Sequence, residues 1–135
     1  QKNESDFIAC LEMVFGKGNV EVHDNGSPIF GFQGDDRSKA HKTSSDYAPP
    51  CHIIIRRKYI GSASNDIGYK RTEDGKYVSY ISDYDKRVFT KDKQNKVAQE
   101  YASRVAEKKL KTNGYSVKKT VSSDGKIKIT ATKYK

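Results

Sequence analysis

Lysine and arginine side chains are concentrated in the last third of this 135-residue chain. Residues 86–135 carry 15 Lys and Arg against 4 Asp and Glu, a balance of +11, whereas residues 1–85 carry 11 against 13, a balance of −2. Clustered cations raise the local electrostatic potential and attract polyanions. The chemistry that the C-terminal segment could do is therefore the binding of phosphate groups, most plainly those of a nucleic acid.

The candidate contacts come from a predicted helix over about 92–113 and a predicted hairpin after it. On the helix, apolar residues between Val97 and Leu110 share one arc at 100° per residue, and charged residues occupy the opposite arc. On the hairpin, lysines alternate with apolar residues, so that one face is expected to be buried and the other solvated. The candidate polyanion-binding residues are Lys93, Lys96, Arg104, Lys108, Lys111, Lys118, Lys126 and Lys128.

The charged arc of the helix also has a plainer interpretation as a solvated face. Lys96–Glu100, Glu100–Arg104 and Glu107–Lys111 are i,i+4 pairs that can neutralise each other. Such pairs contribute only about 0.2–0.5 kcal/mol each, and they leave most of the surplus positive charge unexplained. The sequence alone leaves polyanion binding and simple solvation open.

A second basic patch is interleaved with aromatic residues. It consists of Arg56, Arg57, Lys58, Lys70 and Arg71. Exposed rings on a basic sheet can stack on unpaired bases. The tyrosines nearby are also ordinary strand formers, so packing within a sheet is the expected fate of most of them.

Catalytic and metal-binding patterns are weak. The three histidines, His23, His41 and His52, lack metal-ligand spacing, and no nucleophile motif occurs. We therefore expect no catalytic residue, no metal and no cofactor. An enzyme acting on an anionic small molecule through His23, His52 or the loop aspartates is the least favoured function. These aspartates, for which the sequence suggests no partner, are Asp35, Asp36, Asp46, Asp83 and Asp85.

Turn residues and periodicity predict the elements of the N-terminal part. A short amphipathic helix is expected over about 5–15, with glycines ending it. Strands at 20–22 and 29–32 read as a hairpin around the turn Asp24-Asn25-Gly26-Ser27. Residues 34–50 are rich in polar residues and prolines and are predicted to be a flexible loop.

The remaining elements are more sharply marked. The apolar run Cys51–Ile55 predicts a central strand buried on both faces. A hairpin over 66–82, with its turn at Glu73-Asp74-Gly75, comes before the long helix, which Gly114 should end. The last hairpin should turn at Ser123-Asp124-Gly125.

The chain is therefore expected to be a single α+β domain over residues 1–135. Antiparallel β-hairpins form a sheet, which is packed by one long C-terminal helix (about 92–113) and one short N-terminal helix (about 5–15). Cys10 and Cys51 are expected to be free, buried thiols, which indicates a reducing compartment such as the cytoplasm. No apolar run approaches the roughly 20 residues of a membrane span, so no membrane partner is expected.

Short motifs are spread over most of the chain: Asp66-Ile67-Gly68-Tyr69-Lys70-Arg71, Asp74-Gly75-Lys76-Tyr77, Ser82-Asp83-Tyr84, Tyr101-Ala102, Asn113-Gly114-Tyr115-Ser116-Val117 and Asp124-Gly125-Lys126-Ile127. Together they resemble the signature of domain of unknown function 1257. Upstream, Phe7 to Phe15 and Gly31-Phe32-Gln33-Gly34 are similar to the first helix and the Gly-aromatic strand of that family. The family comprises conserved open reading frames of cyanobacteria and algal plastids, with bacterial and phage members.

The resemblance carries expectations of its own. Family members usually open with a strand before the first helix, and that strand is missing here. They often end in Arg-Trp, whereas this chain ends in Lys133-Tyr134-Lys135. The chain also has a long insertion between Gly34 and Cys51. These departures indicate a divergent member, for which cytoplasm, plastid stroma and infected-cell cytoplasm are the expected locations. Members are commonly encoded near an AAA-type ATPase. The resemblance thus implies the alternative function, a protein-interaction or assembly component such as an ATPase adaptor, a virus-encoded regulator or a virion part.

Overall fold

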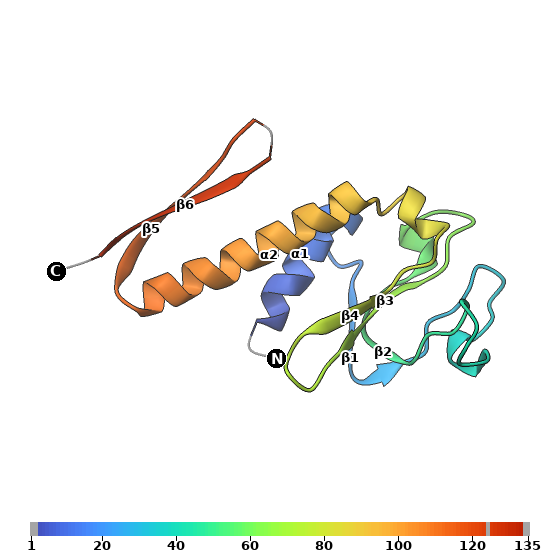
Figure 1. Cartoon of the computed structure of the whole chain (residues 1–135). Helices are drawn as coiled ribbons and strands as arrows, with labels where there is room; N and C mark the ends of the chain where they lie inside the picture. The colour runs from blue at the N-terminus through green and yellow to red at the C-terminus, as the bar shows by residue number, and fades with distance from the viewer. Residues whose placement is uncertain (1–2, 124, 134–135) are drawn as a thin grey trace.

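Two antiparallel sheets and two α-helices make up the computed structural model, which describes residues 3–123 and 125–133 (Figure 1). The elements are α1 (Glu4–Phe15), β1 (Glu21–Ser27), β2 (Cys51–Ile55), β3 (Ile67–Arg71), β4 (Tyr77–Tyr80), α2 (Lys91–Thr112), β5 (Tyr115–Val121) and β6 (Ile127–Lys133). Strands β1–β4 form one sheet in chain order, and β5 pairs only with β6. The predicted α+β single domain is confirmed, but the hairpins form two sheets rather than one. We call β5 and β6 the C-terminal ribbon; its expected turn residue Asp124 lies outside the described residues.

Helix α1 covers one face of the four-stranded sheet. Its apolar spacing places Phe7, Leu11 and Phe15 against residues of β2 and β3. Phe7 meets Tyr69 edge-on at 5.1 Å between ring centroids and stacks on Tyr77 at 4.7 Å. Burying each such large apolar side chain contributes about 1.5–3 kcal/mol to stability. The cluster that these residues form with their neighbours is the larger of the two buried clusters, and we call it the main core. It consists of Phe7, Cys10, Leu11, Phe15, Ile53, Ile55, Ile67, Tyr69, Phe89 and Val97.

The segment between β1 and β2 covers the opposite face of the sheet. Ile29 and Ala48 are fully buried there against Cys51 and Ile54 of β2. Strand β2 is therefore buried on both faces, as its continuous apolar run predicted. The segment over 34–50, predicted to be a flexible loop, contains the buried Arg37 and Ala48. Its flexibility stays a prediction.

The predicted hairpin over 20–32 is wrong. Strand β1 runs through the expected turn from Glu21 to Ser27 and pairs with β2, with a register irregularity between Val22 and Ser27. Gly26 does have a positive φ of 83°, but it uses that conformation inside an irregular strand beside Pro50. Pairing with the apolar β2 replaces the local turn, and Ile29 is buried with Ala48, Cys51 and Ile54, a group that we call the second core cluster.

Helix α2 begins and ends where the sequence predicted. The Thr90 hydroxyl accepts a hydrogen bond from the Lys93 amide at the start, and Gly114 follows the end with a φ of +85°. The N-terminal half contacts the main core through Val97 and Tyr101. The C-terminal half extends past the sheet and holds the C-terminal ribbon alongside it (Figure 1).

The orientation of α2 differs from the amphipathic expectation. Only Val97 and Ser103 are buried in the whole helix. Ala98, Ala102 and Ala106, all on the arc expected to face the core, are exposed. Much of the charged arc instead lies between α1 and the C-terminal ribbon, because ion pairs to both elements hold it there.

Candidate functional site

The charged arc of α2 is largely neutralised by ion pairs. Arg104 lies 3.1 Å from Glu100, and Lys111 lies 3.0 Å from Glu107. Lys108 forms a close ion pair with Asp6 of α1. Three of the sequence-predicted candidates, Arg104, Lys108 and Lys111, therefore pair with carboxylates, although Lys108 and Lys111 keep 56% and 59% of their side chains exposed.

Glu100 ties the C-terminal ribbon to this arc. Lys119 of β5 donates to it at 2.6 Å, and Arg104 donates to the same oxygen. These hydrogen bonds, first that of Lys119 and then that of Arg104, hold the pKa of Glu100 below its usual range. Together with Asp6 and Glu107, Glu100 makes the groove between α1 and the ribbon a surface of mixed charge.

Two further helix candidates remain solvated. Lys93 and Lys96 are exposed on the N-terminal half of α2, and neither forms an ion pair with a described residue. They lie at the end of the helix that contacts the core, whereas the ribbon candidates project from a separate sheet. The structure does not merge the eight predicted cations into one patch.

The outer face of the C-terminal ribbon carries lysines and hydroxyl groups. Alternation turns every second side chain away from α2, and all six of these side chains are exposed. The cross-strand partners are Ser116 with Thr132, Lys118 with Thr130, and Thr120 with Lys128. Neither Lys118 nor Lys128 forms an ion pair within residues 3–123 and 125–133. Lys126 is exposed near the turn, beside α2.

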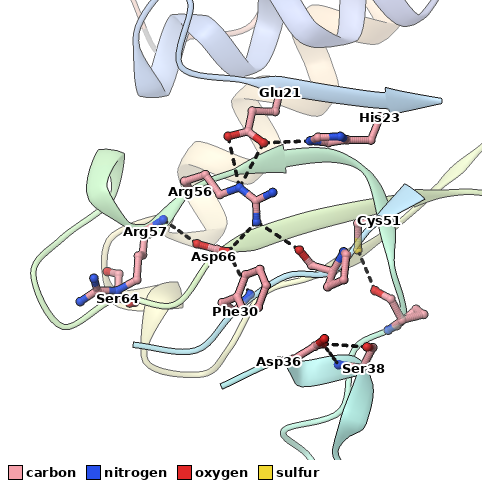
Figure 2. A network of polar contacts seen from close by, with 12 residues as sticks. Glu21, His23, Phe30, Asp36, Ser38, Cys51, Arg56, Arg57, Ser64 and Asp66 are labelled. Atoms are coloured by element: carbon pink, nitrogen blue, oxygen red, sulfur yellow. Dashed lines mark hydrogen bonds and ion pairs between the residues drawn. The ribbon is translucent and has the colours of Figure 1, made fainter. Parts of the chain in front are cut away.

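Arg56, from the second basic patch, lies in an internal polar network rather than on an open surface (Figure 2). Its guanidinium donates to Glu21 from Nε at 3.1 Å and to Asp66 from Nη1 at 3.0 Å. Asp66 is 2% exposed and also accepts the backbone amides of Phe30 (2.9 Å) and Arg57 (2.8 Å). This network joins β1, β2 and β3 to the segment that follows β1.

The other members of that patch divide between structural contacts and solvent. Arg57 donates to the carbonyls of Ser64 (3.0 Å) and Ser62 (2.7 Å), and Arg71 pairs with Glu4 of α1 at 2.5 Å. Lys58 lies over the ring of Tyr59. Lys70 is exposed. The arginines of this patch hold segments of the chain together.

The structure also forms a polar pocket that sequence reasoning missed. Residues from three separate segments surround a hollow of about 360 Å³, which we call the Arg37 pocket. Its lining is Gly31, Phe32, Asp35, Arg37, Ser45, Asp46, Asn65, Ile81, Ser82, Asp83 and Tyr84. Three of the loop aspartates, for which the sequence suggested no partner, thus meet at one place. The motifs Gly31–Gly34 and Ser82–Tyr84, quoted above for the family resemblance, converge there.

The histidines do not meet. His23 contacts Glu21 at 2.8 Å, and the Nδ1 atom of His52 accepts the backbone amide of Arg71. Over the described parts of the chain, no three His, Cys, Asp or Glu side chains are grouped to hold a metal ion.

Both cysteines are free and buried, which confirms the expectation from the sequence. Cys10 lies in the main core, and Cys51 lies in the cluster on the other face of the sheet. Burial raises the pKa of Cys51 to about 11 and also raises the pKa of Cys10, so neither thiol is poised as a nucleophile at neutral pH.

These features define a small α+β protein built on a four-stranded antiparallel sheet with an appended β-ribbon. A family model described as "Protein of unknown function (DUF1257)" matches residues 19–130, and the chain belongs to that family. The matched range begins after α1. Neither a curated protein nor a solved structure matches the chain. Among the described residues, neither α-helix combines the length and apolar character that crossing a bilayer requires.

Proposed function

We propose that this protein is a non-catalytic binding module that contacts nucleic acid through the outer face of its C-terminal ribbon. The observation that carries the proposal is the composition of that face: two lysines and four hydroxyl side chains, all exposed, with no acidic residue among them. These residues are Ser116, Lys118, Thr120, Lys128, Thr130 and Thr132.

The shape of the ribbon supports the same proposal. A two-stranded antiparallel ribbon is narrow enough to enter the major groove of duplex DNA. Lysine and hydroxyl side chains are the usual donors to phosphate oxygens, and such contacts position a protein without reading sequence. Lys93 and Lys96 would add attraction at longer range, whereas the charges of Arg104, Lys108 and Lys111 are balanced by paired carboxylates.

The test is a charge reversal on the ribbon with a matched control elsewhere. We expect the Lys118→Glu/Lys128→Glu variant to bind a labelled random-sequence duplex at least tenfold more weakly than the wild type, because two cationic contacts become repulsive. Lys39→Glu/Lys42→Glu makes the same change in net charge on the segment before β2, where both lysines are exposed. Equal losses in the two variants, or no binding by the wild type at low salt, would refute the proposal.

The exposed arc of α2 favours a second candidate, a protein-interaction component. Ala98, Ala102 and Ala106 form an exposed stripe with Lys91 and Lys109 at its two ends, by heptad spacing. Beside it, a groove of about 450 Å³ between α2 and β6 is lined partly by Ile127 and Ile129. Small side chains allow close approach of another helix, and the flanking lysines fit an amphipathic partner helix with acidic edges.

This candidate predicts a different set of variants. Ala102→Glu should disrupt a stoichiometric protein complex that survives nuclease treatment, since it places a charge on the stripe. Co-purification followed by size-exclusion chromatography measures this effect. A complex that forms equally well with Ala102→Glu would exclude this face of α2 as the docking surface.

A further inference from the structure

The Arg37 pocket contains a buried cation whose bonding is incomplete. Arg37 is 6% exposed, and its Nε donates to the backbone carbonyl of Asp46 at 2.8 Å. Its Nη1 atom is buried and has no hydrogen-bond partner among the described residues. A guanidinium is always charged at neutral pH, and a buried charged donor without an acceptor is strongly unfavourable. The Nη1 atom of Arg37 therefore retains hydrogen-bonding capacity that the described residues do not use.

The backbone around Arg37 is firmly placed. Its amide donates to the carbonyl of Ile29 at 3.0 Å, and its carbonyl accepts the amide of Ala48 at 3.2 Å. Both partners belong to fully buried residues of the second core cluster. The side chain is therefore held in the wall of the pocket by the core of the protein rather than by a surface loop.

Another part of the lining is held by a buried carboxylate. Asp85, which is fully buried, accepts hydrogen bonds from the Asn65 side chain at 3.2 Å and from the Ser82 hydroxyl at 2.6 Å. Asn65 in turn accepts the amide of Phe32 at 2.9 Å. These contacts fix three lining residues before any ligand enters, which is the preorganisation that a binding site needs.

The exposed lining has the opposite charge to Arg37. The carboxylates of Asp35 and Asp46 are exposed and accept no hydrogen bond from a described residue, and Asp83 contributes a third carboxylate that pairs with Lys86 at 3.3 Å. Two half-exposed rings, Phe32 (52%) and Tyr84 (45%), also line the hollow. The pocket thus combines one buried cation with an acidic and aromatic rim.

We propose that the Arg37 pocket binds a free α-amino acid, with the ligand carboxylate on Arg37 and the ligand ammonium group on Asp35 and Asp46. A zwitterion is the ligand class that satisfies both ends of the pocket. The excess of carboxylates opposes phosphates and other multiply charged anions, and a simple amine leaves Arg37 without an acceptor. A volume of about 360 Å³ accommodates one amino acid with its side chain between the two rings.

The experiment is a titration of the full chain followed by isothermal calorimetry and amide NMR, with L-lysine and L-alanine as probes. Both should bind saturably and shift the amide signals of Asn65 and Ser82, and L-lysine should bind more tightly because of its extra positive charge. Alanine methyl ester, acetate and methylamine each lack one of the two charges and should bind at least about tenfold more weakly. Equal binding of the methyl ester, saturable binding of inorganic phosphate at this pocket, or no saturation by either amino acid up to about 20 mM would overturn the proposal.

Two variants localise the effect. Asp46→Asn removes an exposed carboxylate and should weaken L-lysine binding about tenfold without unfolding the protein. Glu73→Gln, an exposed carboxylate in the turn between β3 and β4, is the matched control and should bind as the wild type does. Arg37→Gln should abolish binding, with circular dichroism confirming that the chain is folded. If Asp46→Asn and Glu73→Gln both bind with wild-type affinity, the ligand is not held as proposed. Because the ribbon lies outside this pocket, Lys118→Glu/Lys128→Glu should keep full amino-acid affinity.

Discussion

Replacing Asp66 with alanine is expected to lower the free energy of unfolding by about 3–5 kcal/mol. The substitution leaves the charge of Arg56 without its buried partner and leaves the amides of Phe30 and Arg57 without an acceptor. A domain of this size is stable by only about 5–15 kcal/mol, so the variant should be close to unfolding at ambient temperature. Urea denaturation followed by circular dichroism measures the change.

The matched control is Asp24→Ala. Asp24 is exposed on β1 and has no hydrogen bond or ion pair with a described residue, so its loss should change the unfolding free energy by less than about 0.5 kcal/mol. If Asp66→Ala were as stable as Asp24→Ala, the network of Figure 2 would not hold the strands together as described.

The substitution Gly68→Ala is expected to destabilise the protein by about 1–3 kcal/mol through overpacking. A Cβ atom at this position of β3 would lie 2.5 Å from the Cys51 sulfur, 2.9 Å from the Cys51 Cβ and 3.1 Å from a methyl group of Ile29. Because all three atoms belong to fully buried residues, the added methyl group has no space to enter. The midpoint of urea unfolding is the measurement.

A second substitution separates this clash from a general effect of removing glycine. Cys51→Ala deletes the nearest atom, so the double variant should lose less stability than the sum of the two single losses. Strict additivity would mean that the contact between Gly68 and Cys51 does not limit packing in the second core cluster.

Periodicity predicted most of the elements because their signals are local. The helix over 5–15, the strand from Cys51 and the hairpin over 66–82 each follow from apolar spacing within one segment. The Asn25-Gly26 dipeptide led to the wrong prediction of a hairpin over 20–32, because it fixes only the local backbone conformation. The pairing of β1 with β2 depends instead on residues about 30 positions away. Local chemistry does not determine which of two strands a segment will join.

For the candidate site too, the sequence predicted only what depends on neighbouring residues. Alternation placed Lys118 and Lys128 on a solvated face, and the structure has them there. The neutralisation of Lys108 by Asp6 could not be foreseen, since the two residues are brought together only when α1 packs against α2. The burial of Arg37 could not be predicted either, since it too depends on packing between distant segments. The residues next to Arg37 in the sequence are polar, as in any exposed loop.

The most direct test of the central claim is the salt dependence of duplex binding. Each phosphate contact that is lost should reduce the magnitude of the slope of log K against log salt by about 0.9, so neutral Lys118→Ala/Lys128→Ala should reduce it by about 1.8 between roughly 50 and 200 mM NaCl. Lys39→Ala/Lys42→Ala should retain the wild-type slope. A ribbon variant with the wild-type slope, or wild-type binding that does not change with salt, would contradict nucleic-acid recognition by the C-terminal ribbon.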